Sequence, residues 1–376
     1  MVHADIFRYD YFLPPELIRK QGIEPRDAAR LFVYDTATDS VTHDTFVNLA
    51  AYLPKHALMV INETRVVPAR LMLRKETGGK IEVFVLANEI SAASDMMPVL
   101  VDRKCVPGMR LLFPDGSVFE VVSQAENRFF VRLHSERTLA ELLDAYGETP
   151  IPHYLEDRGI QADEVELRKR YQTVFARSGA SVAAPTASLH FTDRVFASLS
   201  EKDIDTVKVG LDVGLGTFAP LTEKNFETKT LHRERIAVSN DAAERLNRAK
   251  MEGDPIVAVG TTTLRTLESV ILKEISKNTS SARRGEGREG VEDAGDTTCL
   301  FQSYSGETDI FLFHPHRFRS ADILVTNFHL PKSSLMLLVD AFLRDKEAKR
   351  NLVSLYGEAI REGYAFYSFG DSMLIL

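Results

Sequence analysis

ILVTNFHLPKSSLMLLVDAFL, residues 323–343, is the stretch that most clearly predicts the type of fold. Its first three residues are apolar and predict a buried strand, whereas the apolar residues after Ser333 recur with helical spacing. Ser333 or Ser334 can cap that helix, because a serine hydroxyl accepts a hydrogen bond from a backbone N–H of the first turn. A strand that leads into a helix is typical of α/β domains.

The same order recurs elsewhere in the chain. Residues 255–259 predict a strand and residues 262–273 the helix after it. Residues 30–34 and 57–61 predict two buried strands, with a helical stretch between them. We therefore predict an α/β major domain in which helices pack on a mixed sheet.

The pattern changes after Val66, where six short strand-like runs follow one another between Gly-Gly, Pro-Gly and Pro-Asp-Gly turn signals. This predicts a small, all-β, barrel-like domain of residues 66–149. It would be inserted into a discontinuous α/β catalytic domain of residues 1–65 and 150–376. Residues 276–296 are polar and glycine-rich and predict a mobile loop, since they have too few apolar side chains to order themselves.

The composition is that of an ordinary globular protein. The 376 residues favour two domains, and 44% of them are hydrophobic and 27% charged. A net charge of −8 argues against a protein coated with nucleic acid, although a local basic face stays possible. Cys105 and Cys299 match no metal spacing, and neither a signal sequence nor a membrane span is evident. We expect a cytoplasmic protein with no metal site.

Two histidines stand in apolar runs beside hydroxyl groups and a proline. His190 lies in APTASLHFT, residues 184–192, and His329 lies in the segment quoted first. A buried polar group without a partner costs roughly 1–3 kcal/mol, so such groups either find partners or do chemistry. Together with DVGLGTF, residues 212–218, the two segments predict the walls of one site.

The glycine motif of residues 212–218 also resembles the first motif of class I methyltransferases, in which glycines let the backbone approach S-adenosylmethionine. That interpretation requires a helix directly after the glycines, and the following residues show no apolar helical stripe. The alternative is a turn in which glycine relieves crowding. Asp212, Gly214, Gly216 and Thr217 remain candidates for binding a ligand.

Seven further segments carry a resemblance that runs along the chain. They are YDYFLPPELI at residues 9–18, RDAARL at 26–31, NETRVVPARL at 62–71, YQTVFA at 171–176, VGTTTLRTLE at 259–268, TDIF at 308–311 and YSFGDSMLI at 367–375. In this order, and with the two histidine segments, they resemble the S-adenosylmethionine:tRNA ribosyltransferase-isomerase family. The chain departs from the family pattern at Ser188, where glycine is usual, and at Asp212, where histidine is usual. A carboxylate at residue 212 cannot donate the hydrogen bond of a neutral imidazole.

The resemblance implies an enzyme that transfers and isomerises the ribosyl moiety of S-adenosylmethionine. The implied acceptor is 7-aminomethyl-7-deazaguanine at the wobble position of tRNA, and the products are epoxyqueuosine-tRNA, adenine and methionine. S-adenosylmethionine is then a substrate, no cofactor is bound, and we expect a monomer. Two other hypotheses stay open: an S-adenosylmethionine-dependent methyltransferase and a non-catalytic RNA-binding protein. The released products distinguish the three.

The implied chemistry requires a base for a ribose proton and an acid or donor for departing adenine, which favours groups that titrate near neutrality. His190 and His329 are the first candidates, and a core histidine bonded to a carbonyl is the alternative for each. His232 and Glu234 form a further pair, because alternate positions of a strand share a face. A solvated charged face is the alternative for that pair.

Other side chains are candidates for binding the donor. Thr186 can bind ribose hydroxyls, and Asn327 can pair with the edge of adenine. Asp309 can hold the ammonium group or the ribose. Arg265 can hold the carboxylate through a forked contact, or form an ion pair with Glu268 along its helix.

Basic side chains supply most of the affinity of proteins for nucleic-acid phosphates. Two stretches of the chain are rich in them, and solvated surface faces are the alternative. The tRNA-binding candidates are Arg65, Arg70, Arg74, Lys75, Arg168, Lys169 and Arg170.

Overall fold

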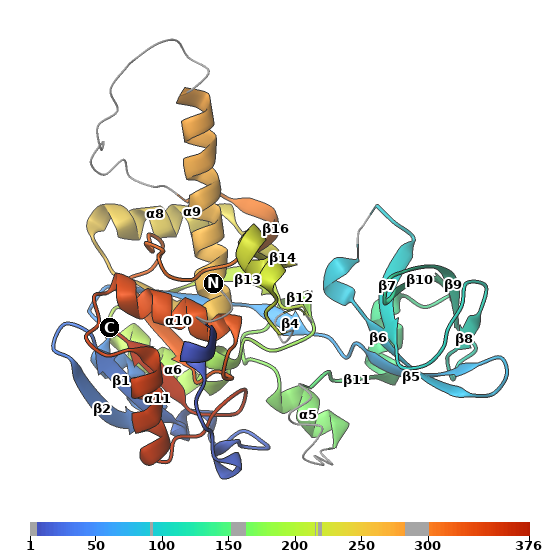
Figure 1. Ribbon diagram of the computed structural model, residues 1–376, viewed down its shortest axis with the longest axis horizontal. Helices are drawn as coiled ribbons and strands as arrows, with labels where there is room; N and C mark the ends of the chain where they lie inside the picture. The colour runs from blue at the N-terminus through green and yellow to red at the C-terminus, as the bar shows by residue number, and fades with distance from the viewer. Residues whose placement is uncertain (1–5, 91–92, 152–162, 215, 217–219, 283–300) are drawn as a thin grey trace. The chain divides into compact units, whose positions relative to one another are not determined.

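The computed structural model describes residues 6–90, 93–151, 163–214, 216, 220–282 and 301–376, with the backbone alone for residues 273–282. The chain forms two compact units (Figure 1). The first consists of Met1–Glu63, Pro185–Leu211 and Ala219–Leu376. The second consists of Thr64–Ala184 and Asp212–Phe218.

A nine-stranded mixed sheet in the order β16-β14-β13-β3-β15-β17-β18-β1-β2 is the centre of the first unit. The strands are β1 (Arg30–Asp35), β2 (Ser40–Thr45), β3 (Leu58–Asn62), β13 (Asp205–Asp212), β14 (Thr230–Val238), β15 (Ile256–Val259), β16 (Tyr304–Ile310), β17 (Ile323–Asn327) and β18 (Ser372–Ile375). Strands β13, β3, β15 and β17 run parallel, whereas β14 with β16 and β1 with β2 are antiparallel pairs. The predicted mixed α/β architecture is therefore confirmed.

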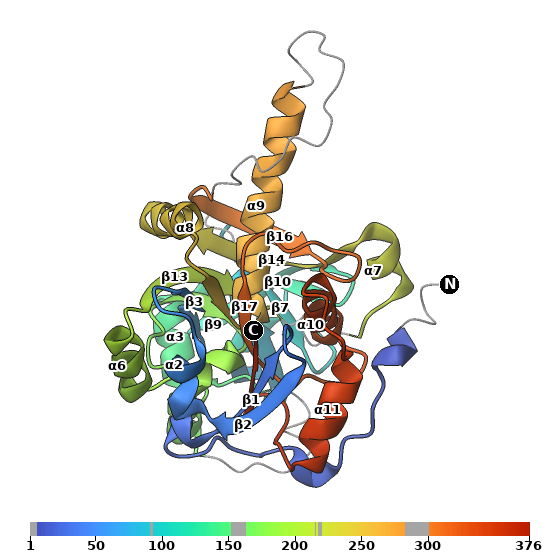
Figure 2. The same cartoon turned by 90° about the vertical axis from the view of Figure 1, so that its left-hand side faces the viewer.

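Helices cover both faces of this sheet, with α2 and α6 on one side and α10 and α11 on the other (Figure 2). The helices are α2 (Leu49–Tyr52), α6 (Asp193–Glu201), α7 (Glu223–Thr228), α8 (Asn240–Glu252), α9 (Thr261–Ala282), α10 (Ser334–Asp345) and α11 (Leu352–Arg361), and the 3-10 turns are η1 (Phe7–Tyr9), η2 (Pro15–Leu17), η3 (Arg26–Ala28), η4 (Phe46–Asn48) and η6 (Thr186–His190). Ser333 caps α10, since its side chain accepts a hydrogen bond from the backbone N–H of Met336 at 3.3 Å. The stretch quoted first is thus β17 followed by α10, as predicted.

Two local predictions differ from the structure. The stretch between β1 and β3 contains the polar edge strand β2 as well as helical turns, because β2 pairs with β1 as a hairpin. The predicted loop of residues 276–296 begins inside α9, which continues to Ala282. Residues 276–282 contain neither glycine nor proline, so no strong helix breaker stands there. Residues 283–296 lie outside the described part of the chain.

The second unit contains a seven-stranded antiparallel sheet in the order β11-β5-β6-β7-β10-β9-β8, and β8 pairs with β5 as well. The strands are β5 (Arg70–Lys75), β6 (Lys80–Val85), β7 (Met96–Val101), β8 (Arg110–Leu112), β9 (Val118–Ala125), β10 (Arg128–His134) and β11 (Gly147–Glu148). Alternate residues of these strands are buried, among them Leu71, Val83 and Val131. The extra pairing joins β5, β6, β7, β10, β9 and β8 in a ring around this apolar core.

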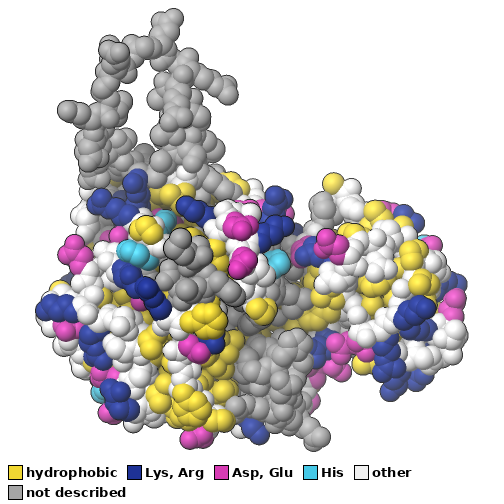
Figure 3. Space-filling view, viewed as in Figure 1, with side chains coloured by type: hydrophobic (Ala, Val, Ile, Leu, Met, Phe, Trp, Pro, Cys, Tyr) yellow, Lys and Arg dark blue, Asp and Glu magenta, His cyan; other side chains and the backbone are white. Residues whose placement is uncertain are grey.

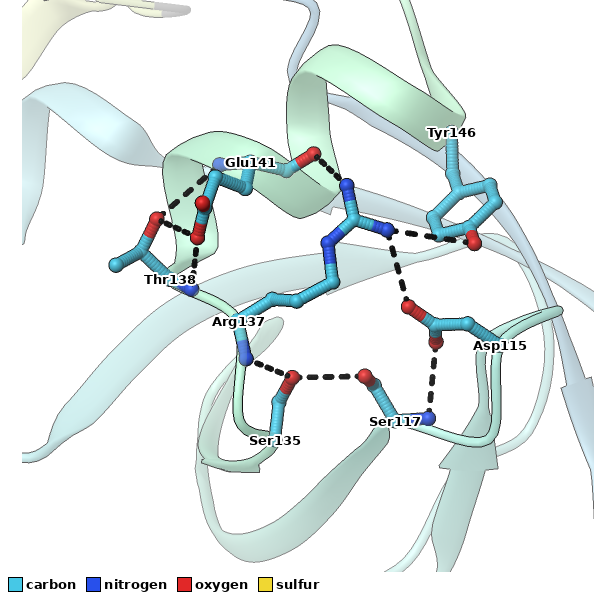
Figure 4. Close-up of polar contacts among 7 residues, drawn as sticks. All are labelled: Asp115, Ser117, Ser135, Arg137, Thr138, Glu141 and Tyr146. Carbon is cyan, nitrogen blue, oxygen red and sulfur yellow. Dashed lines mark hydrogen bonds and ion pairs between the residues drawn. The ribbon is translucent and has the colours of Figure 1, made fainter.

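Helix α3 (Leu139–Tyr146) packs against this sheet, and its N-terminus is held by a polar network (Figure 4). Thr138 and Glu141 form a capping box, in which each side chain accepts a hydrogen bond from the other's backbone N–H. Arg137 donates to the carbonyl of Glu141 at 3.0 Å and to the carboxylate of Asp115 at 3.2 Å. The helix is thereby tied to the turn before β9.

Residues 163–184, which the sequence-based boundaries place in the α/β domain, group with the second unit. They include α5 (Glu164–Arg170) and β12 (Ser178–Ser181), and β12 pairs in parallel with β4 (Thr64–Val66). The turn η5 (Ala87–Glu89) completes the elements of this unit that the structure describes.

Candidate active site

His190 ends the turn η6 in the first unit and is 5% exposed. Its ring lies 5.1 Å from the ring of Phe46, centroid to centroid. Burial lowers the pKa of His190 to about 4, and the nearby Asp371 carboxylate opposes this shift in part. The imidazole is therefore neutral at physiological pH.

The two ring nitrogens of His190 have different surroundings. One forms a hydrogen bond with the backbone of Arg26, which raises the pKa and is therefore a donation from the ring to a carbonyl. Nε2 is buried and has no hydrogen-bond partner. Because a neutral imidazole donates through one nitrogen and accepts through the other, Nε2 carries a free lone pair. The arrangement suits a hydrogen-bond acceptor or a general base.

His329, after β17, is also buried, and burial lowers its pKa to about 3. Its Nε2 lies 2.9 Å from the hydroxyl oxygen of Thr326. Its backbone N–H donates to the hydroxyl of Tyr356 at 3.1 Å, and its carbonyl accepts a hydrogen bond from Tyr11. His329 therefore has fixed partners both in the backbone and in the side chain.

Several polar groups without partners lie where the parallel strands end. Gly260, between β15 and α9, donates its N–H to the carbonyl of Val325 in β17 at 2.7 Å. A Cβ on Gly260 would lie 3.7 Å from the Cβ of Ala187 in η6. The turn before α9, the end of β17 and η6 therefore meet at one edge of the sheet, where ligands commonly bind in open α/β sheets. Asn327 ends β17, and its Oδ1 is buried without a partner, while its Nδ2 donates to the carbonyl of Tyr367.

Arg265 in α9 forms a buried ion pair with Glu234 of β14, and the two side chains are 5% and 3% exposed. The hydrogen bond comes from Nη1, whereas Nε and Nη2 are buried and have no partner. The alternative pair with Glu268 does not form. Glu268 instead accepts hydrogen bonds from His316 Nε2 at 3.0 Å and from the hydroxyl of Ser320 at 2.6 Å.

His232 and Glu234 do not form the pair that their spacing predicts. His232 is exposed, whereas Glu234 is buried against Arg265. The pairing of β14 with β16 shifts register between Thr230 and Glu234, so the simple alternation of strand faces is broken there. Asp309 lies half-buried on β16, and Thr186 half-buried on η6.

Asp371 is a residue of this site that the sequence interpretation did not single out. It is fully buried and accepts hydrogen bonds from Arg19 Nη1 at 2.8 Å and from the backbone N–H of Ala365 at 2.8 Å. Its charge acts on the pKa of His190. The signal was present in YSFGDSMLI, residues 367–375, where Asp371 is the single charged residue.

A family model described as queuosine biosynthesis protein matches residues 6–375. The chain belongs to this family. Two relatives named S-adenosylmethionine:tRNA ribosyltransferase-isomerase are similar over nearly their whole length. The one from Carboxydothermus hydrogenoformans is 37% identical over 369 residues, 98% of each chain. The one from Moorella thermoacetica is 40% identical over 377 residues, 99% of each chain. A crystal structure of S-adenosylmethionine tRNA ribosyltransferase from Thermotoga maritima is 29% identical, has a TM-score of 0.50 and covers 98% of this chain and 99% of that one.

Asp212 belongs to the second unit. Its Oδ1 accepts hydrogen bonds from the hydroxyl of Thr64 at 2.6 Å and from the backbone N–H of Ala180 at 3.1 Å. The contacts hold β4 and β12 together. A Cβ on Gly179 would lie 2.5 Å from this carboxylate oxygen, so the close approach requires glycine. Gly214 and Gly216 follow, whereas Thr217 lies outside the described residues.

The basic candidates for tRNA binding differ in exposure, and an exposed one can also have a partner, since Arg74 donates to the carbonyl of Gly78 at 3.4 Å. Arg65, Arg74 and Lys169 are exposed. Arg168 bonds to Glu164 at 2.8 Å and to the carbonyl of Asp144 at 3.0 Å.

The other basic candidates also have partners. Arg170 forms an ion pair with Glu166 at 2.6 Å, Arg70 lies 3.8 Å from Glu82, and Lys75 donates to the carbonyl of Lys104 at 2.6 Å. Figure 3 likewise shows basic side chains interspersed with acidic ones on the face in view.

Two features are absent from the described residues. None of their histidine, cysteine, aspartate and glutamate side chains form a group of three that could hold a metal ion. In the same part of the chain, no helix has the length and apolar character needed to cross a membrane.

Proposed function

We propose that this chain is an S-adenosylmethionine:tRNA ribosyltransferase-isomerase of queuosine biosynthesis. The observation that carries the proposal is its similarity to relatives of that name over 97–99% of its length. The enzyme uses S-adenosylmethionine as a substrate and transfers and isomerises its ribosyl moiety onto tRNA.

We further propose the chemical details of the reaction. The acceptor is the 7-aminomethyl-7-deazaguanine base at the wobble position, and the products are epoxyqueuosine-tRNA, adenine and methionine. The enzyme acts as a cytoplasmic monomer and binds no additional cofactor. The family resemblance of the whole chain supports these details.

Within the site, His190 is the proposed general base, and its neutral ring with a free Nε2 lone pair supports this role. Asn327 is proposed to accept a hydrogen bond from the amino group of adenine, since its Oδ1 has no partner and its Nδ2 is already engaged. His329 is the second acid–base candidate, and its contact with Thr326 offers a hydroxyl through which a proton can pass.

The remaining assignments rest on residue type and exposure. Thr186 and Asp309 are proposed to bind the ribose hydroxyls and the ammonium group. Gly214, Gly216 and Thr217 are proposed to approach a ligand through the backbone, and Asp212 supports them from the corner of β4 and β12.

For tRNA, we propose that the exposed Arg65, Arg74 and Lys169 contact phosphates, together with Lys75. Arg70, Arg168 and Arg170 already have acidic partners, and a phosphate contact would cost each of them an ion pair, so we propose that they contribute less to tRNA affinity.

We also propose that the strands of the second unit form a barrel-like domain near residues 66–149, inserted into a discontinuous α/β catalytic domain. The pairing of β8 with β5 supports closure of this sheet.

A product assay tests the proposed function. The protein is incubated with S-adenosylmethionine and tRNA that carries the 7-aminomethyl-7-deazaguanine, and the small molecules are separated by chromatography. We expect adenine and methionine with this tRNA and neither with tRNA that lacks the modified base. Release of S-adenosylhomocysteine would instead identify a methyltransferase. Binding of tRNA without any product would identify a non-catalytic RNA-binding protein.

A further inference from the structure

The guanidinium group of Arg265 is buried, and one edge of it has no hydrogen-bond partner. Arg265 is 4% exposed, and Nη1 donates to Glu234, itself 3% exposed. Nε and Nη2 are buried and have no hydrogen-bond partner. Buried donors without partners are rare in folded proteins and costly, particularly on a charged group. This pattern therefore points to a ligand.

The unpartnered edge of Arg265, formed by Nε and Nη2, is suited to one kind of ligand group. Nε–H and Nη2–H lie in one plane and point in the same direction, with a spacing that matches the two oxygens of a carboxylate. The bond from Nη1 to Glu234 keeps the guanidinium from turning this fork away. Glu234 is therefore a positioning residue for Arg265.

The start of α9 supplies a second, independent observation. Thr262 lies one turn before Arg265 on the same face of this helix, and its hydroxyl oxygen has no hydrogen-bond partner. Side chains of a helix lean toward its N-terminus, so the fork of Arg265 lies over the turn that carries Thr262. The N-terminus of a helix attracts anions through its dipole. The same edge of the sheet carries Asn327 at the end of β17, because β15 and β17 are paired neighbours.

We infer that Arg265 and Thr262 bind the carboxylate at the amino-acid end of S-adenosylmethionine, with Glu234 holding the guanidinium in place. This inference rests on the proposed function and names the part of the donor that this corner of the site recognises. A tRNA phosphate offers similar oxygens, but the side chain of Arg265 is 5% exposed and is out of reach of a polymer backbone. The small carboxylate of the donor can enter such a site.

The test compares S-adenosylmethionine with decarboxylated S-adenosylmethionine, which lacks only this carboxylate. Affinity is measured by calorimetry, and adenine release with the modified tRNA is measured separately. The wild type should bind S-adenosylmethionine about 10- to 100-fold more tightly than the decarboxylated compound, the range of a charge-assisted contact. Equal affinity for the two donors would overturn the inference. Absence of adenine release would contradict the proposed function alone, because the affinity ratio is read without turnover.

Variants locate the preference in the named residues. Arg265→Lys keeps the charge but loses the fork, so the affinity ratio should fall close to 1. Arg245→Lys is the matched control, since Arg245 pairs with Asp205 at 3.0 Å in the same unit, and its ratio should be unchanged. In Arg265→Lys the ratio of the two donor affinities could stay unchanged while tRNA binding weakens and its salt dependence falls by about one phosphate. That result would assign Arg265 to tRNA binding instead.

Further variants separate positioning from folding and keep the test decisive if Arg265→Lys does not fold. Glu234→Gln retains an acceptor for Nη1 and should preserve the affinity ratio, whereas Glu234→Ala should lower it. Thr262→Val is nearly isosteric and should reduce the ratio several-fold. If both Glu234→Ala and Thr262→Val fold and keep the wild-type ratio of donor affinities, the assignment of Arg265 and Thr262 to the donor carboxylate is refuted.

Discussion

Replacement of His190 by asparagine separates a catalytic histidine from a packed one. The asparagine amide can still donate to the backbone carbonyl of Arg26, as the ring does now, but it has no atom in the place of Nε2. The change thus removes the free lone pair while it preserves the anchoring hydrogen bond. If His190 is the general base, the rate of adenine release should fall about 10²- to 10⁴-fold.

The structure also sets the expected change in stability. Loss of the ring removes its contact with Phe46 and leaves a small void, which together cost about 1–3 kcal/mol of unfolding free energy at neutral pH. The pKa of His190 lies near 4 in the folded chain, below its usual value of about 6.5. The unfolded chain therefore binds a proton more readily, and the folded state loses about 3 kcal/mol as pH falls from about 6.5 to about 4. His190→Asn should lack this contribution.

Three measurements on one preparation decide the role of His190: unfolding free energy at pH 5 and pH 7, affinity for S-adenosylmethionine, and single-turnover adenine release. We expect donor affinity to stay within a few-fold of the wild type while turnover collapses. His43→Asn is the control, because His43 lies on β2, contacts the hydroxyl of Tyr364 at 2.9 Å and has no proposed role. A normal single-turnover rate in destabilised but folded His190→Asn would refute the assignment and make His329 the next candidate.

Two further predictions follow from the same physics. Burial lowers the pKa of His329 to about 3, so the contribution of its neutral ring to wild-type stability should be full above about pH 6.5 and fall by roughly 5 kcal/mol as pH drops toward 3. Denaturant unfolding at pH 5 and pH 7 measures this dependence, and His329→Asn should reduce the difference in unfolding free energy between the two pH values. An unchanged difference would mean that the ring is protonated in the folded wild type at pH 5. For tRNA, Arg65→Gln and Arg74→Gln should each reduce the salt dependence of binding by about one phosphate, whereas Arg168→Gln should chiefly lower stability because Arg168 bonds to Glu164 and to the backbone of Asp144. Filter binding across salt concentrations checks this, and an equal loss of slope in Arg168→Gln would show that it, too, contacts phosphate.

Elements with a strong apolar period were predictable from the sequence. The apolar stretch of residues 323–343 became β17 and α10 with Ser333 as the cap, and the strand-like runs after Val66 became the paired strands of the second unit. The spacing of apolar residues within each element indicates which side chains are buried, by alternation in strands and by a stripe in helices. Turn residues between the strands, which are also recognised from neighbouring residues alone, indicated where each strand ends.

Elements that depend on a distant partner were not predictable in this way. Strand β12 is Ser-Gly-Ala-Ser, which has no apolar pattern, and it forms because β4 lies beside it in parallel. Strand β2 is polar at an edge of the sheet and is held by its hairpin with β1. In both cases backbone hydrogen bonds to a neighbour decide the structure, and side-chain composition carries little of that information.

In the candidate site, too, the sequence indicates residue types but not the distant partners of each residue. Helical spacing offered Glu268 as a partner for Arg265, and strand alternation offered His232 as a partner for Glu234. Glu268 is instead satisfied by donors from His316 and Ser320, about 50 positions further along the chain, and the register shift in β14 leaves Glu234 facing α9. Arg265 and Glu234 then pair because each has lost its local alternative. Only after these distant partners are placed does it become visible that two donors of Arg265 stay unused. An unsatisfied atom is thus a property of the whole fold, so the sequence can suggest Arg265 as a candidate but cannot show which of its donors have no partner.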